Sequence, residues 1–217
     1  MTKIIEFINV SKTVNKKDLI KNFNYIFEDQ KNYVLYGSNS SGKTLFFNIL
    51  LKKEKIKSGI IEICNENFTS FNKEKLMTYR RQIGFVMQKP IMIEQKTIYE
   101  NLEVPMLFSD IKQKARKEKI DFFLNKLNLI DIKNKYPKNV SLGTKQKISI
   151  IRSLITKPKI LLLDEPFNNI DTNFIDIILD LIKNFIHPHA ITIIATNNQN
   201  VLELFENKNI INFPLIF

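Results

Sequence analysis

The sequence predicts an α/β fold with a parallel sheet core and an inserted helical lobe. Apolar runs of strand length alternate with segments of helical periodicity along most of the chain, which is typical of parallel strands joined by helices. Between Gln88 and Lys159 the periodicity is instead mostly helical, with breaks at Pro105 and Pro137. A helical block of this length between two strands indicates a separate lobe.

The length of 217 residues suits one domain with a sizeable core. We expect a single domain over 1–217, with a core lobe at 1–88 and 157–217 and a helical lobe at about 89–156. Strands are expected at 3–10, 19–27, 33–36, 61–64, 83–87, 159–164, 190–195 and 209–213. Helices are expected directly after a turn at 37–44 and at 73–82, 112–129, 141–155, 172–185 and 201–205.

Local signals support these elements in order. Residues 19–27 alternate between apolar and polar side chains, and the Asn-Lys-Lys-Asp stretch at 15–18 before them is typical of a turn. The segment 112–129 carries its apolar residues on one face, as an amphipathic helix does. Ser141 is a good residue to begin a helix, and the apolar run before Asp164 indicates a buried strand.

The net charge of +11 raises the question of a nucleic-acid partner. The lysines are scattered along the chain, and no basic strand rich in aromatic residues is present to stack bases. We therefore interpret the lysines as solvated side chains, with attraction to an anionic membrane face as a secondary use. We expect no nucleic-acid partner.

The remaining composition predicts a cytoplasmic protein. No run reaches the ~18 apolar residues of a membrane span, and the first residues lack the shape of a cleavable signal. Cys64 is the single cysteine, which excludes an internal disulfide framework and suits a reducing cytosol. Because Cys64 ends an alternating strand pattern, we expect it to be a buried core thiol.

A phosphate-binding loop is predicted at Gly37–Thr44, which fits the pattern G-x-x-x-x-G-K-[ST] between an expected strand and an expected helix. Backbone N–H groups of such a loop surround phosphates, and the following helix offers its positive end. Lys43 can reach the β- and γ-phosphates, and the Thr44 hydroxyl is the expected Mg²⁺ ligand. The expected nucleotide-binding residues are Gly37, Ser38, Asn39, Ser40, Ser41, Gly42, Lys43, Thr44 and Leu45.

An acidic pair, Asp164 and Glu165, follows the buried strand at 160–163. Ligands of open α/β sheets bind at the carboxyl ends of the strands. Asp164 can orient Mg²⁺ through water, and Glu165 can face a water molecule that attacks the γ-phosphate. Gln88 closes another expected strand, and its amide oxygen can bridge the metal and that water. We therefore expect Thr44, Gln88 and Asp164 to form the metal site.

These motifs together resemble the ATP-binding subunit of ABC transporters, from about Ile4 to Asn200. The loop matches Walker A, residues 160–165 match Walker B with its catalytic glutamate, Gln88 falls at the Q-loop and 168–171 at the D-loop. The resemblance implies a P-loop NTPase core with a mixed sheet (a parallel core plus antiparallel N-terminal strands) and an inserted helical subdomain. The strings at 79–88 and 97–102 look most like the FtsE / LolD / MacB branch, and the compact length looks closest to FtsE, with LolD nearly as similar.

The resemblance also implies cofactors and partners. Two ATP molecules, each with Mg²⁺, would lie in a head-to-tail homodimer, between the Walker A motif of one subunit and the signature motif of the other. Hydrolysis would move an integral-membrane permease-type subunit, in cell division as for FtsE with FtsX or in lipoprotein release as for LolD. The protein would then lie peripherally on the inner face of the cell membrane.

Several positions depart from the family pattern. The signature appears as residues 140–144, in which Ser141 and Gly143 keep the family's types but Leu142 and Thr144 do not. Asn197 stands at the switch position where the family has histidine, and Val14 stands where an aromatic residue stacks on adenine. We expect a slow ATPase whose catalytic residues are Lys43, Gln88, Glu165 and Asn197, with Ser141 and Gly143 contacting nucleotide.

Two other functions remain open. The altered signature and switch favour, as the alternative, a nucleotide-gated scaffold with little or no hydrolysis; a nucleic-acid ATPase is a third and weaker hypothesis. His187 and His189 flank a proline, which indicates a loop and not a metal site. Met106, Leu107 and Phe108, which follow Pro105, are candidates for part of a permease-docking surface.

Overall fold

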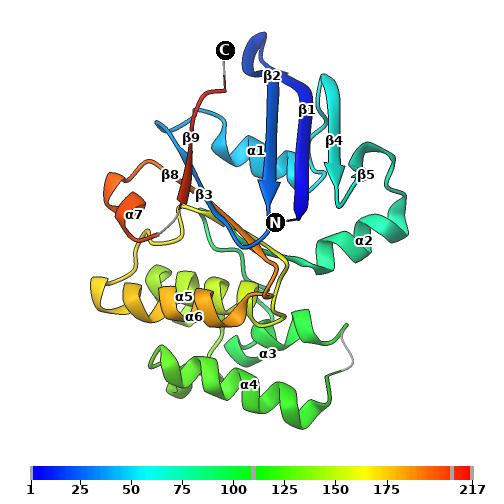
Figure 1. The fold of residues 1–217 in the computed structure, drawn as a ribbon. Helices are drawn as coiled ribbons and strands as arrows, with labels where there is room; N and C mark the ends of the chain where they lie inside the picture. The colour runs from blue at the N-terminus through cyan, green and yellow to red at the C-terminus, as the bar shows by residue number, and fades with distance from the viewer. Residues whose placement is uncertain (1, 109–110, 206–207, 216–217) are drawn as a thin grey trace. The chain divides into compact units, whose positions relative to one another are not determined.

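The computed structural model describes residues 2–108, 111–205 and 208–215, which divide into two compact units (Figure 1). Unit 1 comprises residues 1–80 and 188–217, and unit 2 comprises residues 81–187. The predicted core and helical lobes use other boundaries, and that subdivision stays a prediction. Among the described residues, no helix has both the length and the apolar character needed to span a bilayer.

An antiparallel sheet in unit 1 has the strand order β2-β1-β4-β5. Its strands are β1 (Lys3–Val14), β2 (Lys17–Glu28), β4 (Ser58–Ile63) and β5 (Glu66–Asn67). Figure 1 shows β2, β1 and β4 side by side. Residues 15 and 16 join β1 to β2 with positive φ angles of 49° and 64°, the conformation of a two-residue hairpin turn.

Three parallel strands also lie in unit 1. The central strand β3 (Asn32–Tyr36) pairs on one side with β8 (Ile191–Thr196) and on the other with β9 (Lys208–Asn212). The interior of β3, at residues 33–35, is fully buried, as its apolar run predicts. Because the strands are parallel, the carboxyl ends of β3 and β8 meet at one edge, where the next helix, α1 (Lys43–Leu50), begins.

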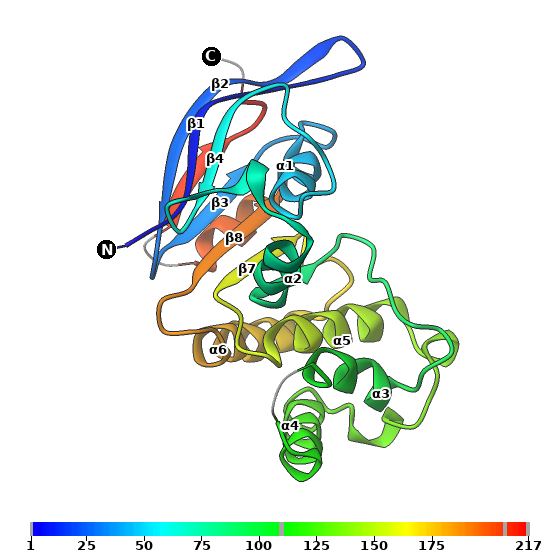
Figure 2. The ribbon, with the colours of Figure 1, turned by 90° about the vertical axis from the view of Figure 1, so that its right-hand side faces the viewer.

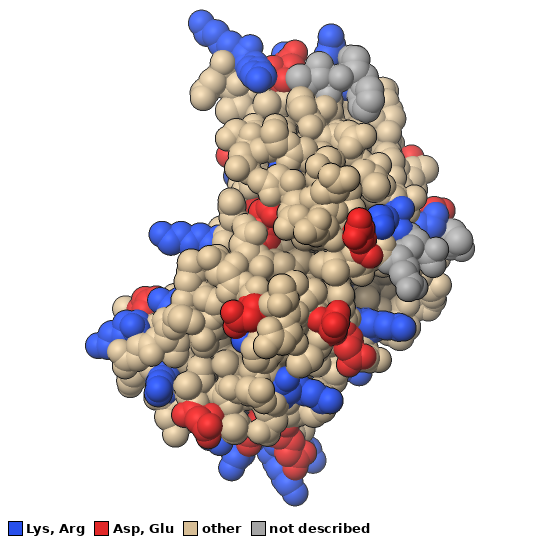
Figure 3. Space-filling model, turned by 90° about the vertical axis from the view of Figure 1, so that its left-hand side faces the viewer, with Lys and Arg blue, Asp and Glu red and all other residues tan. Residues whose placement is uncertain are grey.

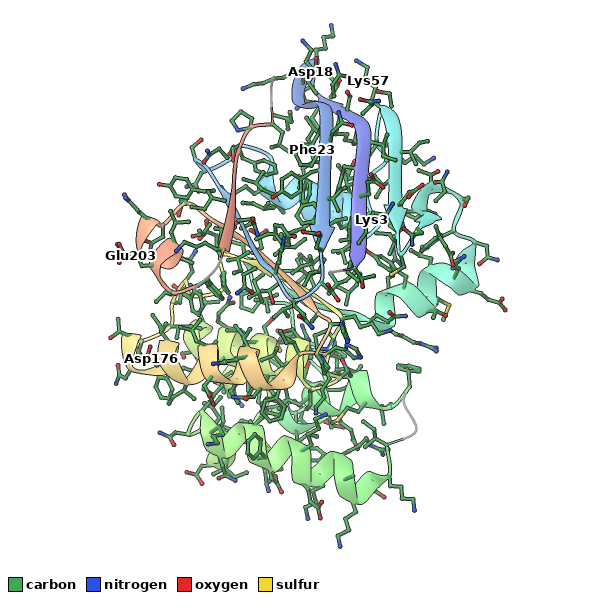
Figure 4. The ribbon with its side chains drawn as sticks, viewed as in Figure 1. Lys3, Asp18, Phe23, Lys57, Asp176 and Glu203 are labelled. Carbon is green, nitrogen blue, oxygen red and sulfur yellow. The ribbon has the colours of Figure 1, made fainter. Side chains whose placement is uncertain are left out.

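An aromatic cluster packs α1 against the antiparallel sheet. The Phe46 ring stacks on Phe7 of β1 at 4.9 Å between ring centroids and meets the rings of Phe23 and Phe27 of β2 at 6.1 and 6.0 Å (Figure 4, where Phe23 is labelled). Phe213, just after β9, touches the same ring at 5.7 Å. All five rings are buried, so the start of α1 is anchored by a large apolar contact.

The other helices of unit 1 support α1 and the sheet edge. The helix α2 (Lys73–Arg81) places Arg80 so that its guanidinium donates to the Leu51 carbonyl at the end of α1, at 2.8 Å from Nη2. A cation at a helix C-terminus is favourable because the last carbonyls carry partial negative charge. The short elements are η1 (Phe68–Ser70) and α7 (Gln199–Glu203).

Unit 2 combines two parallel strands with a set of helices. The strands are β6 (Ile83–Val86) and β7 (Ile160–Asp164). Figures 1 and 2 show α6 beside α5, and α3 between α5 and α4. The helices are α3 (Ile98–Glu103), η2 (Val104–Met106), α4 (Gln113–Lys126), η3 (Ile130–Ile132), η4 (Pro137–Asn139), α5 (Leu142–Leu154), η5 (Thr172–Phe174) and α6 (Ile175–Phe185).

The predicted fold class is confirmed: both units contain parallel strands, the N-terminal strands are antiparallel, and helices occupy the chain between β6 and β7. The expectation of a buried Cys64 is wrong, because this thiol is exposed. The strand β4 ends at Ile63, and Cys64 opens the turn to β5 with a φ of 49°, so its side chain leaves the sheet.

Candidate functional site

The residues expected at the site lie on both units. Unit 1 holds Gly37, Ser38, Asn39, Ser40, Ser41, Gly42, Lys43, Thr44, Leu45 and Asn197, and unit 2 holds Gln88, Ser141, Gly143, Asp164 and Glu165.

The loop at 37–44 connects the buried strand β3 to α1. Its first residue is fixed to the neighbouring strand, because the Gly37 N–H donates to the Thr196 carbonyl of β8 at 3.3 Å. At the other end, Gly42 is the N-cap of α1 with a φ of 106°, and it provides no side-chain hydrogen bond to the helix. Only glycine adopts this backbone conformation without strain. The first N–H groups of α1 therefore have no capping side chain from Gly42 and suit an anion.

Two buried polar groups line this loop. The Lys43 ammonium donates to the carbonyls of Gly37, at 2.7 Å, and Ser38, at 2.9 Å. The Ser41 hydroxyl is buried and has no hydrogen-bond partner among the described residues. A buried cation, a hydroxyl without a protein partner and a helix N-terminus together fit the phosphates of a nucleotide. Thr44 lies exposed in the first turn of α1, where its hydroxyl is accessible to a metal ion on those phosphates.

The structure brings Asn197 to the loop. It follows the last residue of β8, and its Nδ2 donates to Oδ1 of Asn39 at 2.7 Å. The two residues are 158 positions apart, and they meet because β8 pairs with β3 in parallel register. This pairing was not predicted from the sequence, which contains no signal for it beyond the asparagine types themselves.

In unit 2 the acidic pair ends β7. Both Asp164 and Glu165 are buried, and Glu165 has a φ of 46° in the left-handed region. A side chain held in this region at the end of a strand is strained and points to a functional role. Gln88 follows β6, which runs parallel to β7 with Val86 opposite Leu163. The two strands thus direct Gln88 and the acidic pair to the same edge of unit 2.

The signature segment begins α5, as predicted for Ser141. The Ser141 Oγ accepts the Thr144 N–H at 3.1 Å and lies 3.0 Å from the Thr144 hydroxyl. Its capping role therefore engages the hydroxyl that the resemblance assigns to nucleotide. The Leu142 side chain beside it is 49% exposed.

Three contacts attach α5 to the segment after Glu165. The Gly143 Cα faces the Asn169 carbonyl so closely that no Cβ would fit. The Gln146 Nε2 donates to the Pro166 carbonyl at 3.1 Å, and the Lys147 ammonium lies 3.1 Å from the centre of the Phe174 ring. Burial lowers the pKa of Lys147, and the nearby Asp171 carboxylate acts in the opposite direction. Gln146 and Lys147 were missed from the sequence, although polar residues at buried helix positions are a signal for such contacts.

The described residues provide no cluster of side chains that would bind a metal ion in the absence of nucleotide. Among the described ranges, no group of three His, Cys, Asp or Glu side chains could hold a metal. His189 instead contacts Asp29, at 2.8 Å between Nδ1 and Oδ2. The Asp29 pKa is lowered by its hydrogen bond from the Thr2 N–H and, secondly, by His189.

Comparison with known proteins identifies the family. The family model described as ABC transporter matches residues 20–168, more than half of the chain. The chain belongs to the ABC transporter family. The predicted class, a P-loop ATPase domain that uses ATP with Mg²⁺, is confirmed at the level of this family.

Individual relatives are distant in sequence. A methionine import ATP-binding protein, MetN 1 of Staphylococcus epidermidis, is 28% identical over 92% of this chain. The bacitracin export ATP-binding protein BceA of Halalkalibacterium halodurans is 28% identical, with 91% of this chain and 80% of that protein covered. The chain spans 60% of the length of the MetN 1 protein, so the activity, substrate and partners of the whole protein are proposals.

Solved structures of the family have the same fold. The dimeric structure of MJ0796, a bacterial ABC transporter cassette, has a TM-score of 0.86 with 27% identity, over 97% of this chain and 94% of that one. A dimeric post-hydrolysis state of MJ0796 bound to ADP and Pi gives a TM-score of 0.85 with 26% identity, over the same shares of both chains.

The buried Ser41 hydroxyl gives a test of the phosphate loop. We expect Ser41→Ala to leave the thermal unfolding midpoint of the free protein unchanged or raised, because it removes a buried polar group without a protein partner. The same variant should weaken Mg-ATP binding about 5- to 10-fold, the worth of one lost hydrogen bond. Isothermal titration and thermal unfolding measure the two effects, with the exposed Ser38→Ala as the stability control. A large loss of stability, or an unchanged dissociation constant, would contradict the assignment.

Proposed function

We propose that this chain is the ATP-binding and hydrolysing subunit of an ABC-type membrane complex, with slow turnover. The phosphate loop carries the proposal. There the buried Lys43 ammonium and the N-terminus of α1 lie in one segment with the Ser41 hydroxyl, which has no hydrogen-bond partner among the described residues. The segment is fixed to β8 and anchored by Phe46. This combination suits the binding of nucleotide phosphates.

Each site residue has a role in this proposal. Lys43 neutralises charge on the β- and γ-phosphates, and the loop from Gly37 to Leu45 holds them by backbone N–H groups. The resemblance assigns the binding of Mg²⁺, which neutralises phosphate charge when bound, to Thr44 in unit 1 and to Gln88 and Asp164 in unit 2. Glu165 orients and deprotonates the attacking water as general base.

The second nucleotide-contacting surface comes from a second copy of the chain. We infer a head-to-tail homodimer in which Ser141 and Gly143 of one copy approach the terminal phosphate held by the other. The dimeric structures of the relative MJ0796 support a dimer. The exposed Leu142 side chain beside Ser141 opposes close approach of the two copies. Loss of one preorganised contact typically lowers rate by about 10²–10³-fold, which supports slow turnover.

The second candidate is a nucleotide-gated scaffold that binds ATP and dimerises with little or no hydrolysis. The Leu142 side chain favours it, because it is 49% exposed beside Ser141, where the family has a glycine. Asn197 adds to it, because a carboxamide cannot carry the positive charge of a protonated imidazole.

The proposal places the protein in the cytoplasm, peripherally on the inner face of the cell membrane. MetN 1 and BceA are named for import and export, respectively, so the proposal names no cargo. The narrower proposal, a process like that of FtsE or LolD, rests only on the sequence segments 79–88 and 97–102. On the face drawn in Figure 3, basic side chains are dispersed among acidic ones, which supports leaving nucleic acid out of the proposal.

The proposal is tested by steady-state phosphate release from the purified chain with Mg-ATP. We expect slow release that Glu165→Gln abolishes while Mg-ATP binding persists, because the variant removes the base and keeps the loop. Lys43→Ala should weaken binding itself. If wild type and Glu165→Gln both bind ATP and release equally little phosphate, even with the membrane partner present, the result would support the scaffold. Absence of ATP binding would contradict both functions.

A permease-docking surface is proposed at Leu107 and Phe108. These side chains are 51% and 70% exposed, whereas Met106, which was expected to share this surface, is fully buried. That part of the expectation is wrong because Met106 closes η2 toward the interior of unit 2. The Arg81 guanidinium lies 6.0 Å from the centre of the Phe108 ring. Leu107 and Phe108 together form a small exposed apolar patch, and it is contiguous patches of this kind that serve as contact surfaces.

We expect Phe108→Asp to reduce recruitment of the protein to membranes that contain its partner by tenfold or more, about the value of one buried aromatic anchor. Mg-ATP binding should not change, because the phosphate loop is untouched. Co-sedimentation with partner-containing vesicles measures recruitment. The matched control is Phe122→Asp, which changes a 40% exposed phenylalanine of α4; equal effects of the two variants would contradict a specific docking role for Phe108.

A further inference from the structure

We propose that Asn39 is a positioning residue for Asn197, so that the two carboxamides act as one unit in distinguishing ATP from ADP. The inference rests on the proposed nucleotide site. Its direct observation is the hydrogen bond from Asn197 Nδ2 to Asn39 Oδ1, at 2.7 Å, between the segment after β8 and the phosphate loop.

The backbone that carries Asn197 is fixed on both sides. Before it, Thr196 is opposite Tyr36 in the parallel pair of β8 and β3, and its carbonyl accepts the Gly37 N–H at 3.3 Å. After it, the Asn198 N–H donates to the Thr196 hydroxyl at 3.0 Å, and the Asn198 side chain accepts from the Asn200 N–H at 3.0 Å. The direction of the Asn197 side chain toward the loop is therefore set by local hydrogen bonds.

The loop fixes Asn39 in a similar way. The Ser41 N–H donates to the Ser38 carbonyl at 3.3 Å, and Ser40 has a φ of 63°, which closes a turn around Asn39. The Ser38 carbonyl is also held by the Lys43 ammonium at 2.9 Å. The amide–amide contact thus joins two fixed backbones.

This contact has a consequence for phosphate recognition. A hydrogen bond to Asn39 fixes the plane of the Asn197 amide, and hence where its N–H groups point. The proposed site places the phosphates on the same loop, and the family resemblance assigns Asn197 a catalytic role at the switch position, which implies contact with the terminal phosphate. Loss of Asn39 should therefore impair recognition of that phosphate through Asn197, while the inner phosphates remain held by the backbone and Lys43.

A double-mutant cycle on nucleotide affinity tests this coupling. Dissociation constants for Mg-ATP and Mg-ADP are measured by isothermal titration for wild type, Asn39→Ala, Asn197→Ala and the double variant. We expect each single variant to weaken ATP binding about tenfold, and the double variant to be within about twofold of the weaker single, since residues that share one interaction are not additive. ADP affinity should change less than about twofold.

The outcomes separate this inference from the proposed function. If the double variant weakens ATP binding by the product of the two single effects, about a hundredfold, the two residues act independently and the positioning role is overturned. Equal weakening of ATP and ADP would also overturn it, because a general loosening of the loop would affect both. A wild type that binds neither nucleotide would instead contradict the proposed function.

A second measurement detects the positioning role without any nucleotide. Asn197→His places an imidazole against Asn39, and its titration is followed by NMR in the free protein. Adding Asn39→Asp should raise the imidazole pKa by about one unit, because an adjacent carboxylate favours the charged ring. The matched control adds Asn200→Asp, which introduces the same charge on α7. Equal shifts from the two acids would overturn direct contact between positions 39 and 197.

Discussion

The contact of the Lys43 ammonium with the carbonyls of Gly37 and Ser38 organises the site, and the fold around it makes that contact possible. A buried ammonium is unfavourable unless it is paired or hydrogen-bonded. Here two backbone oxygens satisfy it while it stays close to the N-terminus of α1. The positive φ of Gly42 makes the turn, and the packing of Phe46 fixes the helix that follows. A triphosphate complements the local charge that this arrangement creates.

Most of the fold followed from the sequence because local signals and burial agreed. The apolar run of β3 is buried on both sides, and Ser141 caps α5 as its residue type predicted. The wrong predictions concern single residues whose side chains point to the opposite side from the one that the local sequence pattern predicts. Cys64 fits the strand pattern but has a left-handed backbone, which turns it into solvent. Met106 belongs to a short apolar stretch whose periodicity was too brief to assign a buried face.

The site was predictable as a set of residue types, whereas its internal contacts were not. The spacing of Gly37, Gly42 and Lys43 was sufficient to predict the phosphate loop. The hydrogen bond between Asn39 and Asn197 depends on the register of β3 with β8, which no local pattern encodes. The left-handed Glu165 also arises from the tertiary structure and not from its own preference.

The phosphate loop and the signature segment differ in how their polar groups are used. Among the described residues the buried Ser41 hydroxyl of the loop has no hydrogen-bond partner, whereas the Ser141 hydroxyl caps α5 by accepting the Thr144 N–H. Secure binding follows from the loop, and limited hydrolysis is expected from the side chain next to Ser141. Leu142 adds a bulky side chain at the same place, half exposed to solvent.

The most direct measurement is steady-state phosphate release by the double variant Leu142→Gly with Thr144→Gln, compared with wild type at saturating Mg-ATP. Restoring an accessible signature should raise the rate by about 100-fold, the lower end of the range for one recovered transition-state contact. Glu165→Gln should abolish the gain in the same background. An unchanged rate, with Mg-ATP binding intact, would contradict the claim that the signature segment limits turnover.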